Sequence, residues 1–123
     1  FNTLDGLPMH AHRELITGLL KDSLQFDGIV VSDWKAYSRF GGNNIINAGI
    51  DVVMAVDGDL AQFQEGVRNG VLHGEIQEER INDAVRRILR QKFRLGLFEN
   101  PFPDSSLLSK IGTNEHREIA KQA

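Results

Sequence analysis

Hydrophobic residues along the chain follow two spacings, which predict an alternation of helices and strands. Apolar residues three or four positions apart predict a helix over 14–24, an amphipathic helix over about 60–69 and a long helix over about 78–95. The uninterrupted apolar run at 29–31 predicts a strand over 28–32 that is covered on both faces, and Val52, Val53 and Met54 predict a second buried strand over 50–56. The inward face of the long helix is expected to carry Ile81, Val85, Ile88 and Leu89.

Glycines mark the expected ends of these elements. A short helix over 43–48 ends at Gly49, which can adopt the left-handed conformation of a helix C-cap. Turns are expected at Gly70 and Gly74, and Gly96 ends the long helix. Because the short helix separates the two strands, parallel pairing in a βαβ unit is expected. The pattern therefore predicts an α/β fold.

The chain divides into three parts. Residues 1–99 carry the alternating pattern, residues 100–114 open with an irregular, proline-containing run and are expected to form a linker, and residues 115–123 begin a further helix. Two strands cannot close a sheet around a core, and they leave strand edges open. We therefore expect the chain to be a segment of a longer protein, with low stability on its own.

The most informative position is Asp33, which follows the first apolar run and precedes Trp34. Loops converge at the carboxyl ends of parallel strands, so catalytic residues gather there. A carboxylate beside an aromatic ring suits a sugar, whose CH groups stack on the ring while its hydroxyls bind the acid. The same pattern also fits a turn acid after a strand, with Trp34 as core filler. Both interpretations stay open on the spacing alone.

Composition excludes several classes of function. With 41% hydrophobic and 25% charged residues, the chain is an ordinary globular sequence, and its net charge of -3 argues against a nucleic-acid partner. The basic residues between 86 and 94 lie on one helix with acids just upstream, which predicts a solvated face. There is no cysteine, which excludes a disulfide framework, a thiol nucleophile and a thiolate zinc site. The apolar runs are too short to span a bilayer, and no membrane partner is expected.

Other candidate positions carry weaker signals. His10 and His12 form a His-x-His pair, but without a third ligand nearby they predict loop orientation rather than a metal site. Asp51 begins the second strand, where a structural role is expected. Met54 ends that strand, where it can line the mouth of a site or pack in the core. No metal and no cofactor are expected.

A succession of sequence blocks covers essentially the whole chain. The blocks are the turn at 5–11, the helix at 15–20, the run Phe26-Asp27-Gly28-Ile29-Val30-Val31-Ser32-Asp33-Trp34, the strand at 48–54, the helix and turn at 80–89 and 92–98, and the segment at 116–120. In this order the blocks resemble glycoside hydrolase family 3. The resemblance implies a fragment of a (β/α)8 TIM-type barrel, comprising its last strands and helices, plus the linker toward a second α/β sandwich domain. The implied partners are the remainder of the barrel and that second domain, and the implied location is secreted or periplasmic.

The resemblance also implies an activity. Asp33 matches the catalytic nucleophile, and Trp34 matches the aromatic residue that lines the subsite on the leaving side of the sugar. The implied reaction is retaining hydrolysis of terminal β-D-glucosidic bonds, in glucosides or β-glucan oligosaccharides, through a covalent glycosyl-Asp intermediate. The acid/base is expected from the second domain, so no glutamate is assigned and the isolated segment is expected to be inactive. Phe1 stands where related enzymes often carry tyrosine, so only a packing role is expected for it.

Three alternatives remain at this point. β-Xylosidase and β-N-acetylglucosaminidase belong to the same family, and the latter branch usually lacks a tryptophan directly after the nucleophile, so Trp34 favours a glucoside or an exoglucan. The pocket features that recognise the C6 group of a sugar cannot be located in the sequence. From another class of function, the chain could be a catalytically inactive carbohydrate-binding remnant that retains Asp33.

Overall fold

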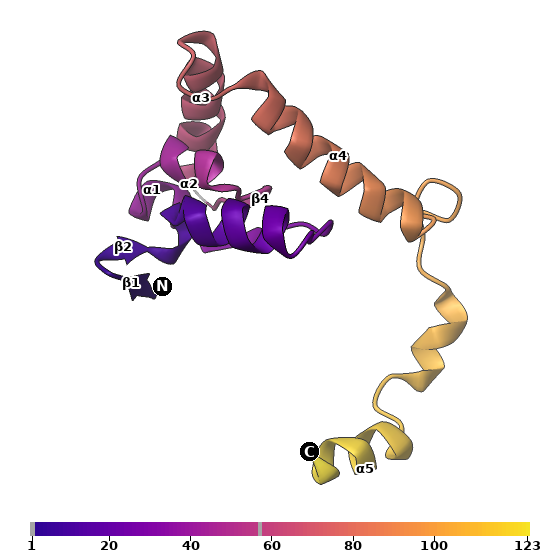
Figure 1. Ribbon diagram of the computed structural model, residues 1–123. Helices are drawn as coiled ribbons and strands as arrows, with labels where there is room; N and C mark the ends of the chain where they lie inside the picture. Colours follow the sequence, from indigo (N-terminus) through magenta and orange to yellow (C-terminus); the bar gives the residue numbers. More distant parts are fainter. Residues whose placement is uncertain (1, 57) are drawn as a thin grey trace. The chain divides into compact units, whose positions relative to one another are not determined.

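The computed structural model describes residues 2–56 and 58–123 and divides the chain into two compact units, Phe1–Gln91 and Lys92–Ala123. The elements are β1 (Thr3–Leu4), β2 (Leu7–Pro8), η1 (Met9–Ala11), η2 (Glu14–Ser23), β3 (Val31–Trp34), α1 (Ala36–Arg39), α2 (Asn43–Ala48), β4 (Val52–Met54), α3 (Asp59–Leu72), α4 (Glu78–Arg94), η3 (Ser105–Lys110) and α5 (Asn114–Gln122). Within the first unit, α3 stands beside α1 and α2, next to the strands (Figure 1). The predicted alternation of helices and strands is confirmed.

The strands β3 and β4 pair in parallel, with α1 and α2 between them in the chain. Val31 lies opposite Val52, and Trp34 lies opposite Met54. This pairing confirms the predicted βαβ arrangement. The described residues also form an antiparallel hairpin, β1–β2, which the sequence analysis does not predict and whose tight turn lies at 5–6.

The predicted bounds of both strands are wrong. β3 begins three residues later than the predicted 28–32 and extends two residues further, and β4 is shorter than the predicted 50–56. Side chains hold the backbone ahead of β3, because the Val30 N–H donates to Asp51 Oδ2 at 2.9 Å and Arg87 donates to the Phe26 carbonyl at 2.7 Å. Backbone groups bonded in this way do not join a ladder.

The short helix α2 ends as predicted. Gly49 has a φ of +117°, and its N–H donates to the carbonyls of Ile45 and Ile46. A Cβ atom at Gly49 would lie 2.7 Å from Thr17 Oγ1, closer than real contacts allow. Glycine at this position therefore serves both the left-handed cap and the close approach of η2, which winds as a π-helix.

Helix α3 continues through Gly70 to Leu72, so the predicted turn at Gly70 is wrong. A Cβ atom at Gly70 would lie 2.5 Å from Asn43 Nδ2 and 3.0 Å from Ile76 Cδ1. The residue is therefore small because two other segments pack against the helix, and the chain turns at Gly74, where φ is +76°.

The core of the first unit lies between η2, α1, α2 and the loop before α4. Its buried apolar residues are Ile16, Ala36, Tyr37, Ile45, Ile46, Ala48, Ile50 and Ile76.

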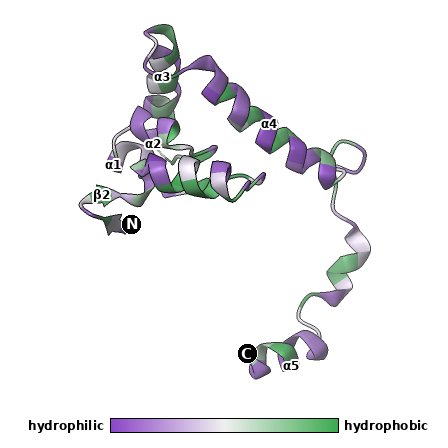
Figure 2. Ribbon diagram, in the orientation of Figure 1, coloured by the Kyte–Doolittle hydropathy of each residue, from purple (hydrophilic) through white to green (hydrophobic). Residues whose placement is uncertain are grey.

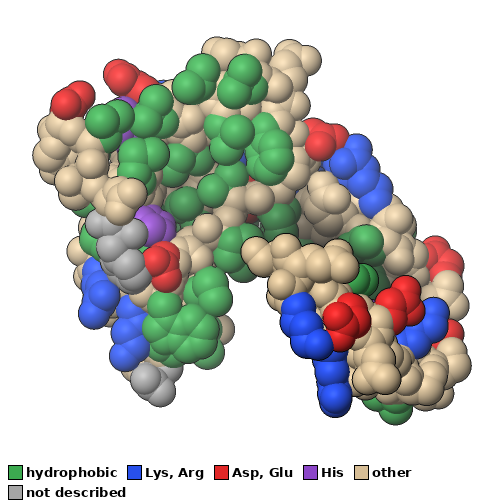
Figure 3. All heavy atoms as spheres, turned by 90° about the horizontal axis from the view of Figure 1, so that it is seen from below, with side chains coloured by type: hydrophobic (Ala, Val, Ile, Leu, Met, Phe, Trp, Pro, Cys, Tyr) green, Lys and Arg blue, Asp and Glu red, His purple; other side chains and the backbone are tan. Residues whose placement is uncertain are grey.

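The predicted inward face of α4 is confirmed in part. Ile81 and Ile88 are half-buried, whereas Val85 and Leu89 are exposed by 46% and 40%. Val31 of β3 is exposed by 46%, so the prediction that the strand is covered on both faces is wrong for this residue. The described elements cover these three residues only in part. Figure 2 shows apolar bands along α4, and Figure 3 shows hydrophobic side chains at the surface.

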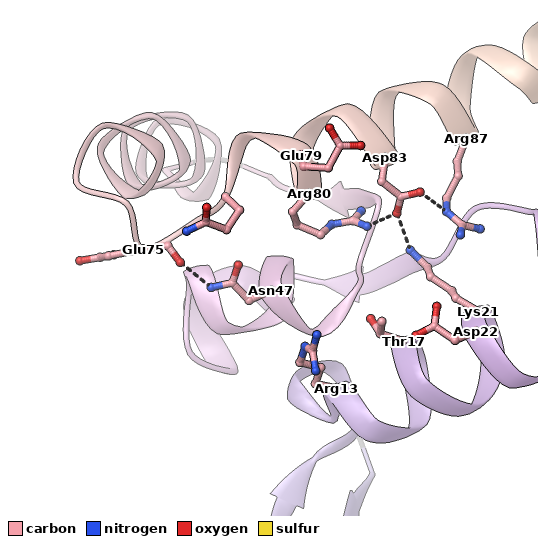
Figure 4. A pocket seen from close by; sticks show the side chains of 11 residues that line it. Arg13, Thr17, Lys21, Asp22, Asn47, Glu75, Glu79, Arg80, Asp83 and Arg87 are labelled. Atoms are coloured by element: carbon pink, nitrogen blue, oxygen red, sulfur yellow. Dashed lines mark hydrogen bonds and ion pairs between the residues drawn. The ribbon is translucent and has the colours of Figure 1, made fainter.

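A charge network joins η2 and α4 to Asp51, the residue before β4. The Asp51 side chain is fully buried and accepts hydrogen bonds from Lys21 Nζ at 2.7 Å and from Arg80. Asp83 accepts from Arg80 and, at 2.9 Å, from Arg87, and it lies 3.7 Å from Lys21 (Figure 4). The predicted structural role of Asp51 is confirmed, since its carboxylate ties two helices to the segment ahead of β3.

This network makes the stability of the fold sensitive to acid. Burial on its own would raise the pKa of Asp83, but the hydrogen bond from Arg87 and the charges of Arg80, Arg87 and Lys21 hold that pKa below its usual value. The ionised Asp83 therefore stabilises the fold above the unfolded pKa of about 3.9, and this contribution is lost as the pH falls through the folded pKa.

Because Asn cannot titrate, an Asp83→Asn variant should show a weaker dependence of its thermal midpoint on pH below about pH 4 than the unaltered protein. Midpoints measured at a series of acidic pH values check this expectation. Parallel profiles for the two proteins would contradict it.

The second unit contains the predicted linker and the following helix. η3 lies within the linker, and Asp104 caps it by accepting a hydrogen bond from the Ser106 N–H at 2.9 Å. The helix predicted over 115–123 is confirmed as α5, which Thr113 caps. Among the described residues, no helix has both the length and the apolar character needed to cross a bilayer.

Candidate functional site

Asp33, Trp34 and Met54 meet at the carboxyl end of the parallel pair. Asp33 and Trp34 are the last two residues of β3, and Met54 is the last residue of β4, opposite Trp34. The side chains of Trp34 and Met54 are exposed by 52% and 38%, and Asp33 is half-buried. Asp33 therefore lies within the strand rather than after it, and the Trp34 side chain is exposed in this chain.

A bulge interrupts the β3–β4 ladder at this point. Ser32 and Asp33 together face the single residue Val53 of β4. The Ser32 hydroxyl accepts a hydrogen bond from the Met54 N–H at 2.9 Å and donates one to the Asp33 carbonyl at 2.8 Å. The Ser32 hydroxyl thus replaces a backbone carbonyl of β3 as the acceptor for the Met54 N–H. Bulges change the direction in which a strand's side chains point, and they are common beside active sites.

The backbone leaves β3 in an uncommon conformation. Lys35 has a φ of +56°, in the left-handed region, and its N–H donates to the Met54 carbonyl at 3.1 Å. Helix α1 begins at the next residue. A non-glycine residue in this region is strained, and such residues cluster at functional sites.

His10 contacts the same segment from η1. Its Nε2 accepts a hydrogen bond from the Asp33 N–H at 2.9 Å, and its ring stacks on Phe40 with centroids 5.0 Å apart. Burial lowers the pKa of His10, against the opposing effect of the Asp33 charge. Sequence reasoning misses this contact, because 23 positions separate the two residues and no local pattern links them.

The Asp33 carboxylate is oriented by its own neighbour, since Oδ1 accepts a hydrogen bond from the Trp34 N–H at 2.6 Å. The acid and the aromatic residue are consecutive at the end of the sheet. Chemically, such a pair can attack or stabilise an electrophilic carbon while the ring stacks on a flat, apolar face of a ligand. The prediction for Phe1 lies outside the described residues.

The network of Figure 4 lies apart from this acid. It borders a polar hollow of about 500 Å³ lined by residues of η2, α4 and the segments next to them, and Asp33, Trp34 and Met54 are not among its lining residues. Within residues 2–56 and 58–123, no three His, Cys, Asp or Glu side chains are grouped as metal ligands.

Comparison with known proteins identifies the family. The model of the glycosyl hydrolase family 3 N-terminal domain matches residues 1–91. The chain belongs to glycosyl hydrolase family 3. This family 3 chain has α/β character, and its Asp33 lies within the matched residues.

Similar proteins carry names of β-glycosidases. The family 3 chain is 34% identical to the lysosomal β-glucosidase of Dictyostelium discoideum, over 95% of the chain and 16% of that protein. It is 33% identical to a putative β-xylosidase of Formosa agariphila, over 98% of the chain and 17% of that protein. The crystal structure of an exo-1,3/1,4-β-glucanase from a Pseudoalteromonas species is 39% identical, with a TM-score of 0.88 over 98% of the chain and 16% of the glucanase. The family 3 chain thus spans about a sixth of the length of these relatives.

Proposed function

We propose that this chain is part of a retaining glycoside hydrolase that cleaves terminal β-D-glucosidic bonds, in glucosides or β-glucan oligosaccharides. The observation that carries the proposal is the position of Asp33. It is the last residue but one of a strand of the parallel pair, next to an exposed tryptophan, in a chain similar to proteins named β-glucosidase and exo-1,3/1,4-β-glucanase. In α/β barrels, catalytic residues occupy this end of the strands.

In the proposed reaction, the Asp33 carboxylate is the nucleophile. One of its oxygens attacks the anomeric carbon of the sugar, and the bond from that carbon to the leaving oxygen breaks as the new C–O bond forms. Water then attacks the same carbon from the opposite side, breaks the ester to Asp33 and releases the sugar. Two inversions give net retention of the β configuration.

The leaving oxygen needs a proton from a second group, which later removes a proton from the water. When that group is a carboxyl, it stands about 5–5.5 Å from the nucleophile in retaining enzymes. No described glutamate is assigned this role, and we place the acid/base on a second domain outside this chain. The isolated chain is then inactive, and the reaction as proposed requires no cofactor.

The proposal also assigns each part of the chain to a domain of the whole enzyme. Residues 1–99 are the last part of a (β/α)8 barrel, residues 100–114 link it to an α/β sandwich domain, and residues 115–123 enter that domain. The exposed apolar side chains Val31, Val85 and Leu89 support this placement, because a face of this kind suits burial against further strands and helices. The partners are the remainder of the barrel, the second domain and a carbohydrate substrate.

Trp34 is assigned to the subsite on the leaving side of the sugar, with Met54 beside it. Replacing Trp34 by alanine should weaken binding of substrate or transition state by about 1–3 kcal/mol, the range found where rings stack on aromatic side chains. A Trp34→Phe variant keeps a ring and should retain most of the activity. Values of kcat/KM for the full-length protein test this, and equal values for the alanine variant and the unaltered enzyme would make Trp34 structural.

β-Xylosidase activity is the second candidate, favoured by the similarity to a protein named putative β-xylosidase. The two activities differ in the C6 group of the sugar, and no described residue is assigned to recognise it. β-N-Acetylglucosaminidase activity is disfavoured by Trp34.

The test is hydrolysis of matched aryl β-glycosides by the full-length protein, with the product anomer followed by proton NMR. The proposal expects the highest kcat/KM with the glucoside and β-glucose as the first product. Faster cleavage of the xyloside would favour the second candidate, and α-glucose as the first product would exclude a retaining mechanism. Sugar binding without turnover would indicate a carbohydrate-binding remnant.

A further inference from the structure

Among the described residues, a side chain and not a strand accepts the backbone hydrogen bond of Asp33 in β3. β4 pairs with one edge of β3, and the Asp33 N–H donates to the side chain of His10 instead. Parallel strands normally satisfy such groups with backbone carbonyls of a neighbouring strand. Here an imidazole nitrogen replaces the carbonyl, 2.9 Å from the amide nitrogen.

From this geometry we infer that His10 is a positioning residue, whose Nε2 fixes the backbone of Asp33 so that its carboxylate is held for attack. The inference rests on the proposed function, since it assigns His10 a role in the same reaction. His10 acts through the Asp33 amide and needs no contact with substrate.

The protonation state of His10 follows from the donor. A backbone N–H can only donate, so Nε2 must offer a lone pair, which places the ring proton on Nδ1 of a neutral imidazole. The lowered pKa of His10 agrees with this state, because burial disfavours the charged ring.

Two segments hold the His10 ring in place, one before and one after β3 in the chain. Phe40, just after α1, stacks on it with an interplanar angle of 10°. η1, which carries His10, packs against α2. The acceptor is therefore fixed by two segments that precede and follow β3 in the chain.

Asp33 is held on its carbonyl side as well. The Ser32 hydroxyl donates to the Asp33 carbonyl and accepts from the Met54 N–H, which anchors the bulge to β4. The Asp33 N–H is held by its hydrogen bond to His10 Nε2. With one anchor lost, the Asp33 backbone can rotate at the bulge, and a misplacement of about 1 Å can slow a reaction by about a hundredfold.

The experiment compares two variants of the full-length protein, His10→Leu and His10→Gln. Both remove the ring that stacks on Phe40, but only Gln carries an acceptor oxygen that can reach the position of Nε2. The measured quantity is the rate at which an activated 2-fluoro-β-glucoside labels Asp33. This rate reports nucleophilic attack alone, because the leaving group departs without an acid.

We expect the His10→Leu variant to label Asp33 about ten- to a hundredfold more slowly than the unaltered protein, and the His10→Gln variant to recover most of that rate. Equal rates for the Leu and Gln variants, whether fast or slow, would overturn the role of the acceptor. If the Leu variant does not fold, His10→Asn takes its place in the comparison. The Asn amide is one methylene too short to reach the position of Nε2. Equal labelling rates for the Asn and Gln variants would again overturn the inference. Failure of the unaltered protein to label at Asp33 would instead contradict the proposed function.

Discussion

Replacing Asp33 by asparagine should abolish turnover of β-glucosides, lowering kcat by roughly 10⁴-fold or more, as happens when a member of a catalytic unit is removed. The amide has nearly the shape of the carboxylate but cannot form the ester to the sugar. Asp33 is half-buried at a strand end, so the variant should fold normally. The measurement is kcat for an aryl β-glucoside, with a thermal midpoint to verify folding.

Asp22→Asn is the matched control, because it removes the same charge from an exposed position on η2. It should leave kcat unchanged. A folded Asp33→Asn variant that retains full activity would contradict the assignment of the nucleophile.

In a variant that lacks the Asp33 carboxylate, a nucleophile added to the solution can take over its role. An Asp33→Gly variant leaves space beside the anomeric carbon, where azide can attack from the face that Asp33 normally occupies. With an activated aryl β-glucoside, the bond to the aryl oxygen breaks, the phenolate leaves and α-glucosyl azide forms. Detection of the α product supports a nucleophilic role, whereas a β product would place the attacking group on the other face.

The largest effect on stability is expected at Asp51. Replacing it by asparagine keeps the shape of the side chain but removes the buried charge that pairs with Lys21 and Arg80, whose side chains are exposed by only 2% and 14%. Breaking a buried ion pair by removing one partner costs about 3–5 kcal/mol, because the other charge stays buried and uncompensated. Midpoints of urea or thermal unfolding measure this loss.

Glu79→Gln is the control for charge removal. Glu79 pairs with Arg86 at the surface of α4, where the two side chains are exposed by 73% and 55%. Such surface pairs contribute little, so the unfolding midpoint of this variant should stay close to that of the unaltered protein. Equal losses for the Asp51 and Glu79 variants would show that burial of the network does not determine its contribution.

Local patterns predict the helices well, because apolar spacing and terminal glycines act within a few residues. The end of α2 at Gly49 and the start of α4 at Glu78 follow from the sequence in this way. Strand bounds depend on distant side chains. β3 begins late because Asp51 and Arg87 bind the backbone before it, and no local signal at 28–30 indicates this.

The same distinction between local patterns and distant contacts applies to the candidate site. Asp33 and Trp34 are predictable because an apolar run stops abruptly at them, and Met54 because it lies toward the end of the next predicted strand. The bulge at Ser32 and the contact with His10 depend on tertiary neighbours, so they emerge only from the structure. The exposure of Val85 and Leu89 is another such case, since a helical stripe indicates an inward face but not which segment covers it.

The central claim is that Asp33 forms a covalent bond to the sugar. The most direct measurement exposes the full-length protein to an activated 2-fluoro-β-glucoside and determines its intact mass, then maps the label by peptide sequencing. The account predicts a single fluoroglucosyl adduct on Asp33. A protein that turns over the parent glucoside but carries its adduct on another residue, or none, would contradict it.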